Sequence, residues 1–328
     1  MIRFVARRIL YMVVTLILVS MISFLIIELP PGDYLDAYVS NLINQGGSVD
    51  QTQIEALKSY YGLDKPTYVR YFQWMKGMSH GDFGRSLQWN QPVIKLIGER
   101  LPWSLFISLS GLIVVYLIGI PVGVYSATHQ YSAGDYFFTF LSFIGVGVPT
   151  FLIAIICLWF YFMATGNAAV GLFSRQYMTA AWSLGKFWDL LKHLWLPALI
   201  TGVTGTAGLI RTMRANMLDE LQKPYVVVAR AKGLSERRIL FKYPFRIAVN
   251  PIIATVGWTL PTLVNGELLT SMVLGLPTIA PMFLDALLSQ DMFLAGSVVF
   301  ILSGLTIIGT FVSDLLLAWV DPRIRGTY

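Results

Sequence analysis

Long uncharged stretches recur along the chain at a length that suits a lipid bilayer. A membrane-spanning helix needs about 20 predominantly apolar residues. Six stretches reach or approach that length, and we expect each to contain one span. They cover residues 9–27, 101–128, 136–174, 194–210, 247–266 and 292–313. The pattern predicts an all-α polytopic membrane protein with six transmembrane helices.

Helix-breaking residues interrupt a seventh uncharged stretch, residues 268–284. Gly275, Pro277 and Pro281 all lie within it. Non-helical backbone at membrane depth is tolerated only where protein buries it or where it lines a cavity. We therefore expect a broken, partly re-entrant segment there, and not a further span.

Basic residues indicate which side of the membrane holds the termini. Six spans place both termini on one side, and the Lys and Arg residues are concentrated there. Three precede the first stretch, nine lie from Arg211 to Arg246, and Arg323 and Arg325 follow the last stretch. Cytoplasmic loops carry an excess of Lys and Arg, so we expect both termini to be cytoplasmic.

The spans and loops divide the chain into three parts. Residues 1–30 contain the N-terminus and the first span, residues 31–100 form an external amphipathic loop, and residues 101–328 form a five-span core with a cytoplasmic loop at 218–250. Two amphipathic stretches are expected to form a small helical cap in the external loop. Their apolar residues are Ile54, Leu57 and Tyr61 in the first, and Tyr68, Tyr71, Phe72 and Met75 in the second.

The composition agrees with a protein that lipid surrounds. Hydrophobic residues make up 55% of the chain and charged residues only 13%, about half the share of an average soluble domain. The net charge of +6 fits basic residues at a cytoplasmic face, because no nucleic-acid recognition module accompanies it. Cys157 is the only cysteine, so it has no partner for a disulfide or a metal site.

The cytoplasmic loop predicts two short helices that meet at a glycine. Pro224 suits the first turn of a helix, Gly233 suits the left-handed residue after its end, and Ser235 suits the cap of the next helix. We expect the first helix to expose apolar residues to the cytosol, namely Tyr225, Val226, Val228 and Ala229. Such a face indicates either a docking surface for a partner or packing against the ends of the protein's own spans.

Four segments carry a resemblance to a known family. The stretch Ala229-Arg-Ala-Lys-Gly-Leu-Ser-Glu-Arg-Arg238 resembles the coupling loop (the EAA loop) of ABC-importer permeases, most closely the dipeptide/oligopeptide/nickel branch. The N-terminal segment 1–31, the segment Gly81-Asp-Phe-Gly-Arg-Ser86 with the later Glu99-Arg-Leu-Pro102, and the C-terminal Asp321-Pro-Arg-Ile-Arg325 are similar to that branch as well. The resemblance covers nearly the whole chain, with the four segments in the family's order.

The resemblance implies a non-catalytic subunit in the cytoplasmic (inner) membrane of a bacterium or archaeon. Two homologous permease subunits would form the translocation path, two separate ABC ATPase subunits would bind ATP and magnesium, and an external binding protein would deliver the solute. Oligopeptides are the expected solute, with oligosaccharides and metal chelates as alternatives. The residues expected to couple to the ATPase are Pro224, Tyr225, Val226, Ala229, Ala231, Gly233 and Ser235.

The coupling loop departs from the family pattern at one position. The glutamate after which the loop is named is replaced by Val227, whereas Ala229 and Gly233 are kept. Docking here would therefore depend on shape and apolar contact more than on a charge.

Two further residues are candidates for the pore or a gate. Glu267 ends the fifth stretch beside the broken segment, where it would line an outer gate, contact solute, or lie as a solvated carboxylate at the membrane interface. Pro149 is expected to kink the third span. The sequence contains no P-loop and no clustered histidines, so we expect no catalytic residue, metal site or cofactor on this chain.

A self-sufficient secondary transporter or channel is the main alternative from another class. It would predict charged residues at several mid-span positions and inverted repeats, neither of which the sequence displays. A membrane scaffold without transport activity would leave the glycine-broken cytoplasmic loop unexplained.

Overall fold

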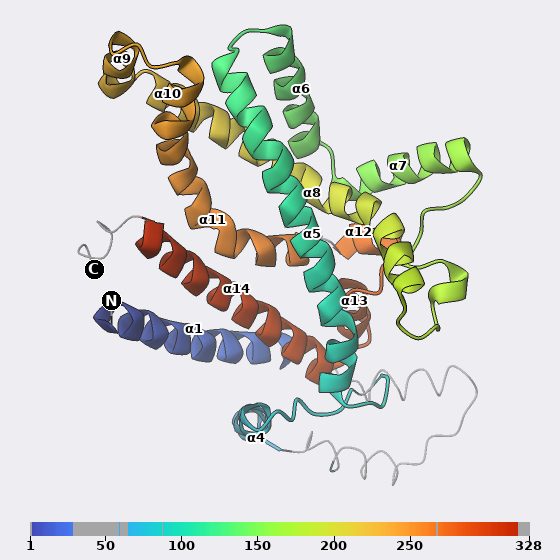
Figure 1. Ribbon diagram of the computed structural model, residues 1–328. Coiled ribbons are helices and arrows are strands. Elements are labelled where there is room, and N and C mark those ends of the chain that lie inside the picture. Colours follow the sequence, from blue (N-terminus) through green and yellow to red (C-terminus); the bar gives the residue numbers. More distant parts are fainter. Residues whose placement is uncertain (1, 29–58, 60–64, 87, 267, 321–328) are drawn as a thin grey trace. The chain divides into compact units, whose positions relative to one another are not determined.

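The computed structural model describes residues 2–28, 59, 65–86, 88–266 and 268–320, and regular structure in these residues is helical (Figure 1). The helices are α1 (Ile2–Glu28), α4 (Thr67–Ser79), α5 (Val93–Thr128), α6 (Ala133–Gly147), α7 (Thr150–Thr165), η1 (Arg175–Tyr177), α8 (Leu184–Leu221), α9 (Pro224–Ala231), α10 (Glu236–Lys242), α11 (Pro244–Gly266), α12 (Leu268–Val273), α13 (Ile279–Leu288) and α14 (Met292–Val320). The predicted all-α fold class is confirmed.

The helices agree with the predicted spans in part. Within the described residues, the helices long and apolar enough to cross a bilayer are Val5–Leu25, Val93–Thr128, Leu184–Leu221 and Met292–Leu316, and the bent pair α6 and α7 adds a fifth candidate. Five of the six predicted stretches fall in these elements. The stretch 247–266 is helical as part of α11 but is not among these candidates, so the count of six spans remains a prediction.

The described residues form two compact units. The core unit contains residues 2–4, 104–266, 268–277 and 308–320, and the second unit contains residues 5–28, 59, 65–86, 88–103 and 278–307. Three of the four unit boundaries fall within α1, α5 and α14, and the fourth falls between α12 and α13.

In the core unit, α5, α8 and α11 share one hydrophobic cluster. Its buried members are Val115, Ala127, Leu209, Met213, Met217, Ala248 and Ile252. They come from the later turns of α5 and α8 and the first turns of α11. The C-terminal parts of α5 and α8 and the N-terminal part of α11 therefore pack together in one core. The amide of Asn216 adds a polar link between α8 and α11, because its Nδ2 donates to the backbone oxygen of Ala248 at 3.0 Å.

Close contact between α5 and α8 depends on glycine. A methyl group built on Gly119 would lie 2.8 Å from a carbon of Leu209, and one on Gly123 would lie 2.6 Å from Met213. Both distances are too short for van der Waals contact, so only glycine lets the helices approach this closely. Small residues have this function at many membrane helix interfaces, since lipid supplies no hydrophobic driving force between helices.

The helix predicted to kink at Pro149 is broken there. α6 ends at Gly147, Val148 is extended with φ −98° and ψ 128°, and α7 begins at Thr150 after Pro149. The two helices differ in direction by 111°. Proline lacks a backbone N–H and disfavours helical geometry in the residue before it, which accounts for a break in place of the predicted kink.

The predicted interruption of the 268–284 stretch is confirmed. α12 ends at Val273 and α13 begins at Ile279. Gly275 has a φ of +60°, and a methyl group there would lie 2.6 Å from a carbon of Val170. The backbone N–H of Gly171 also donates to the oxygen of Leu274 at 2.8 Å, so the break is held against the loop that follows α7.

In the second unit, the second predicted amphipathic stretch folds as helix α4. The side of α4 that packs against other residues differs from the predicted one. Trp74 and Met78 are buried, and the ring of Trp74 lies 5.7 Å from that of Phe24 on α1. Tyr71 shares a hydrogen bond of 2.8 Å with Ser20. Tyr68 and Phe72, which the sequence assigned to the apolar face, are exposed. The rotation arises because the large indole of Trp74 occupies the packed face. The first amphipathic stretch, 54–61, lies outside the described residues except for position 59.

Candidate functional site

The residues of the predicted coupling loop fold as two short helices, α9 and α10, which lie between α8 and α11 and which we call the elbow (Figure 1). Lys223 is extended, with φ −69° and ψ 147°, and Pro224 occupies the first turn of α9. Proline fits this position because the first N–H groups of a helix have no partner within the helix. The start of α9 is therefore where the sequence predicted it.

Gly233 sets the turn between the two helices. Its φ is +72°, as the sequence predicted. Its N–H donates to the oxygen of Arg230 at 2.9 Å, and the N–H of Leu234 donates to the oxygen of Ala229 at 3.3 Å. These bonds satisfy carbonyl groups at the end of α9, as a left-handed residue after a helix commonly does. A methyl group on Gly233 would meet no atom within 4 Å, so its requirement for glycine is a matter of backbone conformation alone.

Part of the face that the sequence predicted to be exposed is buried. Val226 (0% exposed) and Ala229 (5%) pack against Ile239 of α10, with Tyr225, Leu234 and Tyr243 at the edge of this elbow core. Val226 and Ala229 share one side of α9, and the turn at Gly233 brings α10 back across that side. These two residues therefore hold the elbow together and cannot form its outer surface.

The outer face of α9 carries a different apolar pair. Val227 is 59% exposed and Val228 52% exposed. Val227 is the position where the family's glutamate is replaced. The exposed residues nearest the pair along the chain, on α9 and at its two ends, include Lys223, Arg230, Ala231 and Lys232. The exposed face is thus a small apolar patch bordered by positive charge. Sequence reasoning missed Val227 as a candidate because the face that α10 would cover was not known.

An ion pair closes the elbow on its solvent side. Arg230 Nε donates to Glu236 Oε1 at 2.7 Å, and Arg230 Nη2 donates to Oε2 at 3.1 Å. The hydrogen bonds from Arg230 lower the pKa of Glu236 below its ordinary 4.5. Ser235 occupies the predicted N-cap position of α10 without a side-chain capping bond. The link from α9 to the start of α10 is therefore made by Glu236.

A second polar link ties the elbow to α8. The hydroxyl of Tyr225 donates to a carboxylate oxygen of Glu220, near the end of α8. Burial, followed by this negatively charged neighbour, raises the pKa of Tyr225, so the hydroxyl stays protonated and acts as a donor. The ring of Tyr225 also lies 6.2 Å from that of Tyr243, which follows α10. The elbow is thus fixed to the helices on both sides of it.

The structure describes only one of the two pore candidates, Pro149. Pro149 is the residue before α7, where the chain turns by 111°. The hydroxyl of Thr150, one residue later, accepts a hydrogen bond of 3.1 Å from Thr270 of α12. Glu267 lies outside the described residues, between α11 and α12. In the part of the chain that the structure describes, no group of three or more His, Cys, Asp or Glu side chains is arranged to hold a metal ion.

Comparison with known proteins assigns the chain to a family. The model of the binding-protein-dependent transport system inner membrane component matches residues 119–326, and the N-terminal model of the same kind of membrane component matches residues 1–110. The chain belongs to this family of binding-protein-dependent transport components. The predicted permease resemblance is confirmed, and the chain is a multi-pass component of the inner membrane.

Curated relatives and a solved structure agree with the family assignment. The oligopeptide transport system permease protein AppB of Bacillus subtilis is 34% identical over 323 residues, covering 98% of this chain and 99% of the relative. The dipeptide transport system permease protein DppB of Lactococcus lactis is 28% identical, covering 99% of this chain and 100% of the relative. The inward-facing MetNI methionine ABC transporter has a chain of similar fold, with a TM-score of 0.51 at 15% identity over 70% of this chain and 97% of that chain.

Proposed function

We propose that this chain is the permease subunit of an ATP-driven importer of oligopeptides, and that its α9–α10 elbow docks on a separate ATPase subunit. The observation that carries the docking proposal is the exposed pair Val227 and Val228 on an elbow fixed to α8 and α11. An apolar patch on so short a helix has no packing partner in the described chain. A cleft on an ATPase subunit would bury this apolar patch. A movement of the ATPase would then displace the elbow, and with it the membrane helices α8 and α11.

The partners follow from the family. A binding-protein-dependent system requires an external solute-binding protein, and the inner membrane component described here would form half of the path with a second homologous permease. Two ABC ATPase subunits would carry ATP and magnesium. Pro224, Tyr225, Val226, Ala229, Ala231, Gly233 and Ser235 would then form or support the coupling elbow. Val226 and Ala229 would act from inside it.

The proposed orientation places both termini and the elbow in the cytoplasm. Its support is the concentration of Lys and Arg residues from Arg211 to Arg246. With 36 residues, α5 is about 54 Å long, which exceeds the roughly 30 Å hydrocarbon core. Its first turns at Val93 would therefore lie outside, and its last turns at Thr128 inside.

The names of the relatives support peptides as the solute. The two permeases compared above are named for oligopeptide and dipeptide transport. Glu267, which precedes α12 in the sequence, stays our candidate for a residue of the outer gate or a solute contact. Uptake of oligosaccharides or metal chelates in place of peptides would contradict the peptide assignment while leaving the permease assignment intact.

Reconstitution tests the proposal. The chain would be co-expressed with its second permease and ATPases, placed in proteoliposomes, and supplied with the binding protein and radiolabelled trialanine. We expect uptake that requires ATP, and no ATP hydrolysis by the purified chain alone. Val227→Cys in a Cys157→Ser background, labelled with a maleimide that carries a photo-activatable benzophenone, should form a cross-link to the ATPase on illumination. Hydrolysis by the isolated chain, or uptake without any ATPase subunit, would contradict the proposal.

A further inference from the structure

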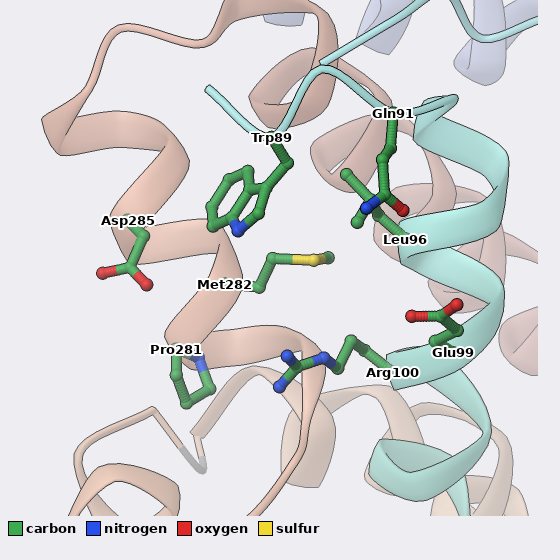
Figure 2. Close-up of a pocket in the computed structure, with 8 residues that line it drawn as sticks. All are labelled: Trp89, Gln91, Leu96, Glu99, Arg100, Pro281, Met282 and Asp285. Carbon is green, nitrogen blue, oxygen red and sulfur yellow. The ribbon is translucent and has the colours of Figure 1, made fainter. Parts of the chain in front are cut away.

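A cavity of about 320 Å³ lies in the second unit, between the first turns of α5 and the helix α13 (Figure 2). We call it the Trp89 pocket. Its lining comprises Trp89, Gln91, Leu96, Glu99, Arg100, Pro281, Met282 and Asp285. Binding sites for small molecules have volumes of about 300–1,000 Å³, so this cavity lies at the small end of that range and suits a small ligand. Neither the family assignment nor the coupling elbow assigns a function to it.

The pocket combines an apolar floor with charges of both signs. Met282 and Leu96 are buried, and Figure 2 shows the indole of Trp89 and the side chain of Met282 directed into the space. Glu99 and Arg100 extend from α5, and Asp285 extends from α13 on the opposite side. The lining therefore offers two carboxylates and one guanidinium around an apolar centre.

These charged groups are available to a ligand. In the described part of the chain, the side chains of Glu99, Arg100 and Asp285 form no ion pair and no hydrogen bond with another residue. Elsewhere in the described chain, two arginines are paired with carboxylates, Arg230 with Glu236 and Arg214 with Asp135. A cavity with unpaired groups of both signs complements a molecule that itself carries both signs.

Hydrogen bonds to a buried carboxylate, and a pair of exposed bonds beside them, hold the wall of the pocket in place. Asp291, which is fully buried, accepts a bond of 2.5 Å from the hydroxyl of Ser86 and one of 3.2 Å from the backbone N–H of Gln88. Arg85 donates to Asn90 through Nε and Nη2, both at 2.7 Å. These contacts fix the chain before and after Trp89. They also account for the Gly81–Ser86 motif, which the coupling function leaves unused.

Glycine is required at position 84, in the segment that precedes Trp89. Gly84 has a φ of +79°, and a methyl group there would lie 2.9 Å from Cδ1 of Phe293 on α14. The segment thus packs too closely for any other residue. This contact fixes the position of the segment beside the pocket against α14.

We propose that the Trp89 pocket binds a short zwitterionic peptide on the external side of the permease. Arg100 pairs with the terminal carboxylate, since a guanidinium matches the geometry of a carboxylate. Asp285 and Glu99 accept from the terminal ammonium group, and Trp89 and Met282 contact a side chain of the peptide. The pocket would receive the peptide after its release by the binding protein. This inference rests on the proposed function, because it requires the solute to be a peptide.

The test compares peptides with free and blocked ends. The complete complex in proteoliposomes, with saturating binding protein, would be supplied with trialanine, trialanine amide and N-acetyl-trialanine. We expect Arg100→Gln to raise the KM for trialanine about tenfold, the loss of one charge-assisted contact, while its effect on trialanine amide is small. Asp285→Asn should raise the KM for trialanine and leave N-acetyl-trialanine nearly unchanged. Arg175→Gln, an exposed arginine of η1, is the matched control and should change neither.

Binding to the complex without binding protein gives a second readout. Saturation-transfer NMR with trialanine should detect contact with the wild-type complex and a weaker signal with Arg100→Gln. If the wild-type complex takes up no trialanine at all, the proposed peptide function fails and this inference fails with it. If trialanine is taken up and Arg100→Gln matches wild type, only the pocket inference is overturned. Equal losses for all three peptides, with weaker affinity for the binding protein, would show a docking surface instead and would also overturn it.

Discussion

Arg214 of α8 donates to both carboxylate oxygens of Asp135 at the start of α6, with Nε–Oδ1 and Nη2–Oδ2 distances of 2.8 Å each. The side chain of Asp135 is only 3% exposed, and the backbone N–H of Tyr131 donates to it as well at 3.0 Å. Two residues after Arg214, Asn216 bonds the backbone of α11. One turn of α8 is thus tied to α6 and to α11, just before the chain enters the α9–α10 elbow.

Loss of this ion pair should destabilise the core unit. Asp135→Ala would leave the Arg214 guanidinium, which is partly buried, without its bidentate partner. Breaking a buried pair costs about 3–5 kcal/mol, and the partial exposure of Arg214 places the expected cost nearer about 2–3 kcal/mol. Thermal unfolding of the detergent-purified protein would measure it. Asp219→Ala, at an exposed position on α8, is the control and should melt like wild type. Equal melting temperatures for Asp135→Ala and wild type would show that the pair is not structural.

The sequence predicted the elements of the elbow well because their signals are local. Pro224 and Gly233 act through backbone geometry that depends on neighbours in the chain, and both lie where they were expected. The exposed face of α9 could not be derived in the same way. It depends on the side from which Ile239 approaches, which the direction of the turn decides. The pairing of Asp135 with Arg214 was missed for a similar reason, since it joins helices 79 residues apart.

The break after α6 was underestimated because one proline does not specify an angle. Pro149 predicts an interruption, whereas the bend of 111° also involves the contact between Thr150 and Thr270 of α12. Similarly, the apolar residues of α4 were identified, but only the packing of Trp74 against Phe24 shows which side of the helix faces inward.

Val227 and Val226 should respond oppositely to substitution, although they are adjacent. Val227→Asp places a charge on an exposed surface, so the protein should fold normally while co-purification of the ATPase falls at least about tenfold, the effect of about 1.4 kcal/mol. Val226→Asp buries an unpaired carboxylate in the elbow core and should lower the yield of folded protein. The measurement is the ratio of ATPase to permease after affinity purification in detergent. If Val227→Asp retains its ATPase at the wild-type ratio, the outer face of α9 is not the docking surface.

The ion pair between Arg230 and Glu236 predicts the pH and salt dependence of coupling. The pKa of Glu236 is lowered in the folded elbow, so the stabilisation it contributes is present above the unfolded value of about 4.5 and is lost as the pH falls through the lower folded value. ATPase affinity should therefore differ between wild type and Glu236→Gln at neutral pH, and the difference should vanish in acid. It should also shrink in about 1 M salt, where exposed charges are screened. Titration of the ATPase by biolayer interferometry at several pH values would measure this difference. A difference that stays undiminished at the acid end of the titration would contradict the role of the pair.

Gly233 gives the most direct test of the elbow, because its substitution changes backbone geometry and little else. A side chain at φ +72° costs about 1–2 kcal/mol, and β-branching adds to that cost, whereas no neighbouring atom lies within 4 Å of a Cβ at this position. Gly233→Val should therefore insert into the membrane at wild-type levels, with α9 and α10 meeting at a different angle. Val227 and Val228 would then miss their site on the ATPase, and both ATPase co-purification and peptide uptake should fall together. Gly233→Asn is the matched control, since asparagine tolerates the left-handed conformation, and it should retain most of both. Wild-type uptake and co-purification by Gly233→Val would mean that this glycine does not set the geometry of coupling.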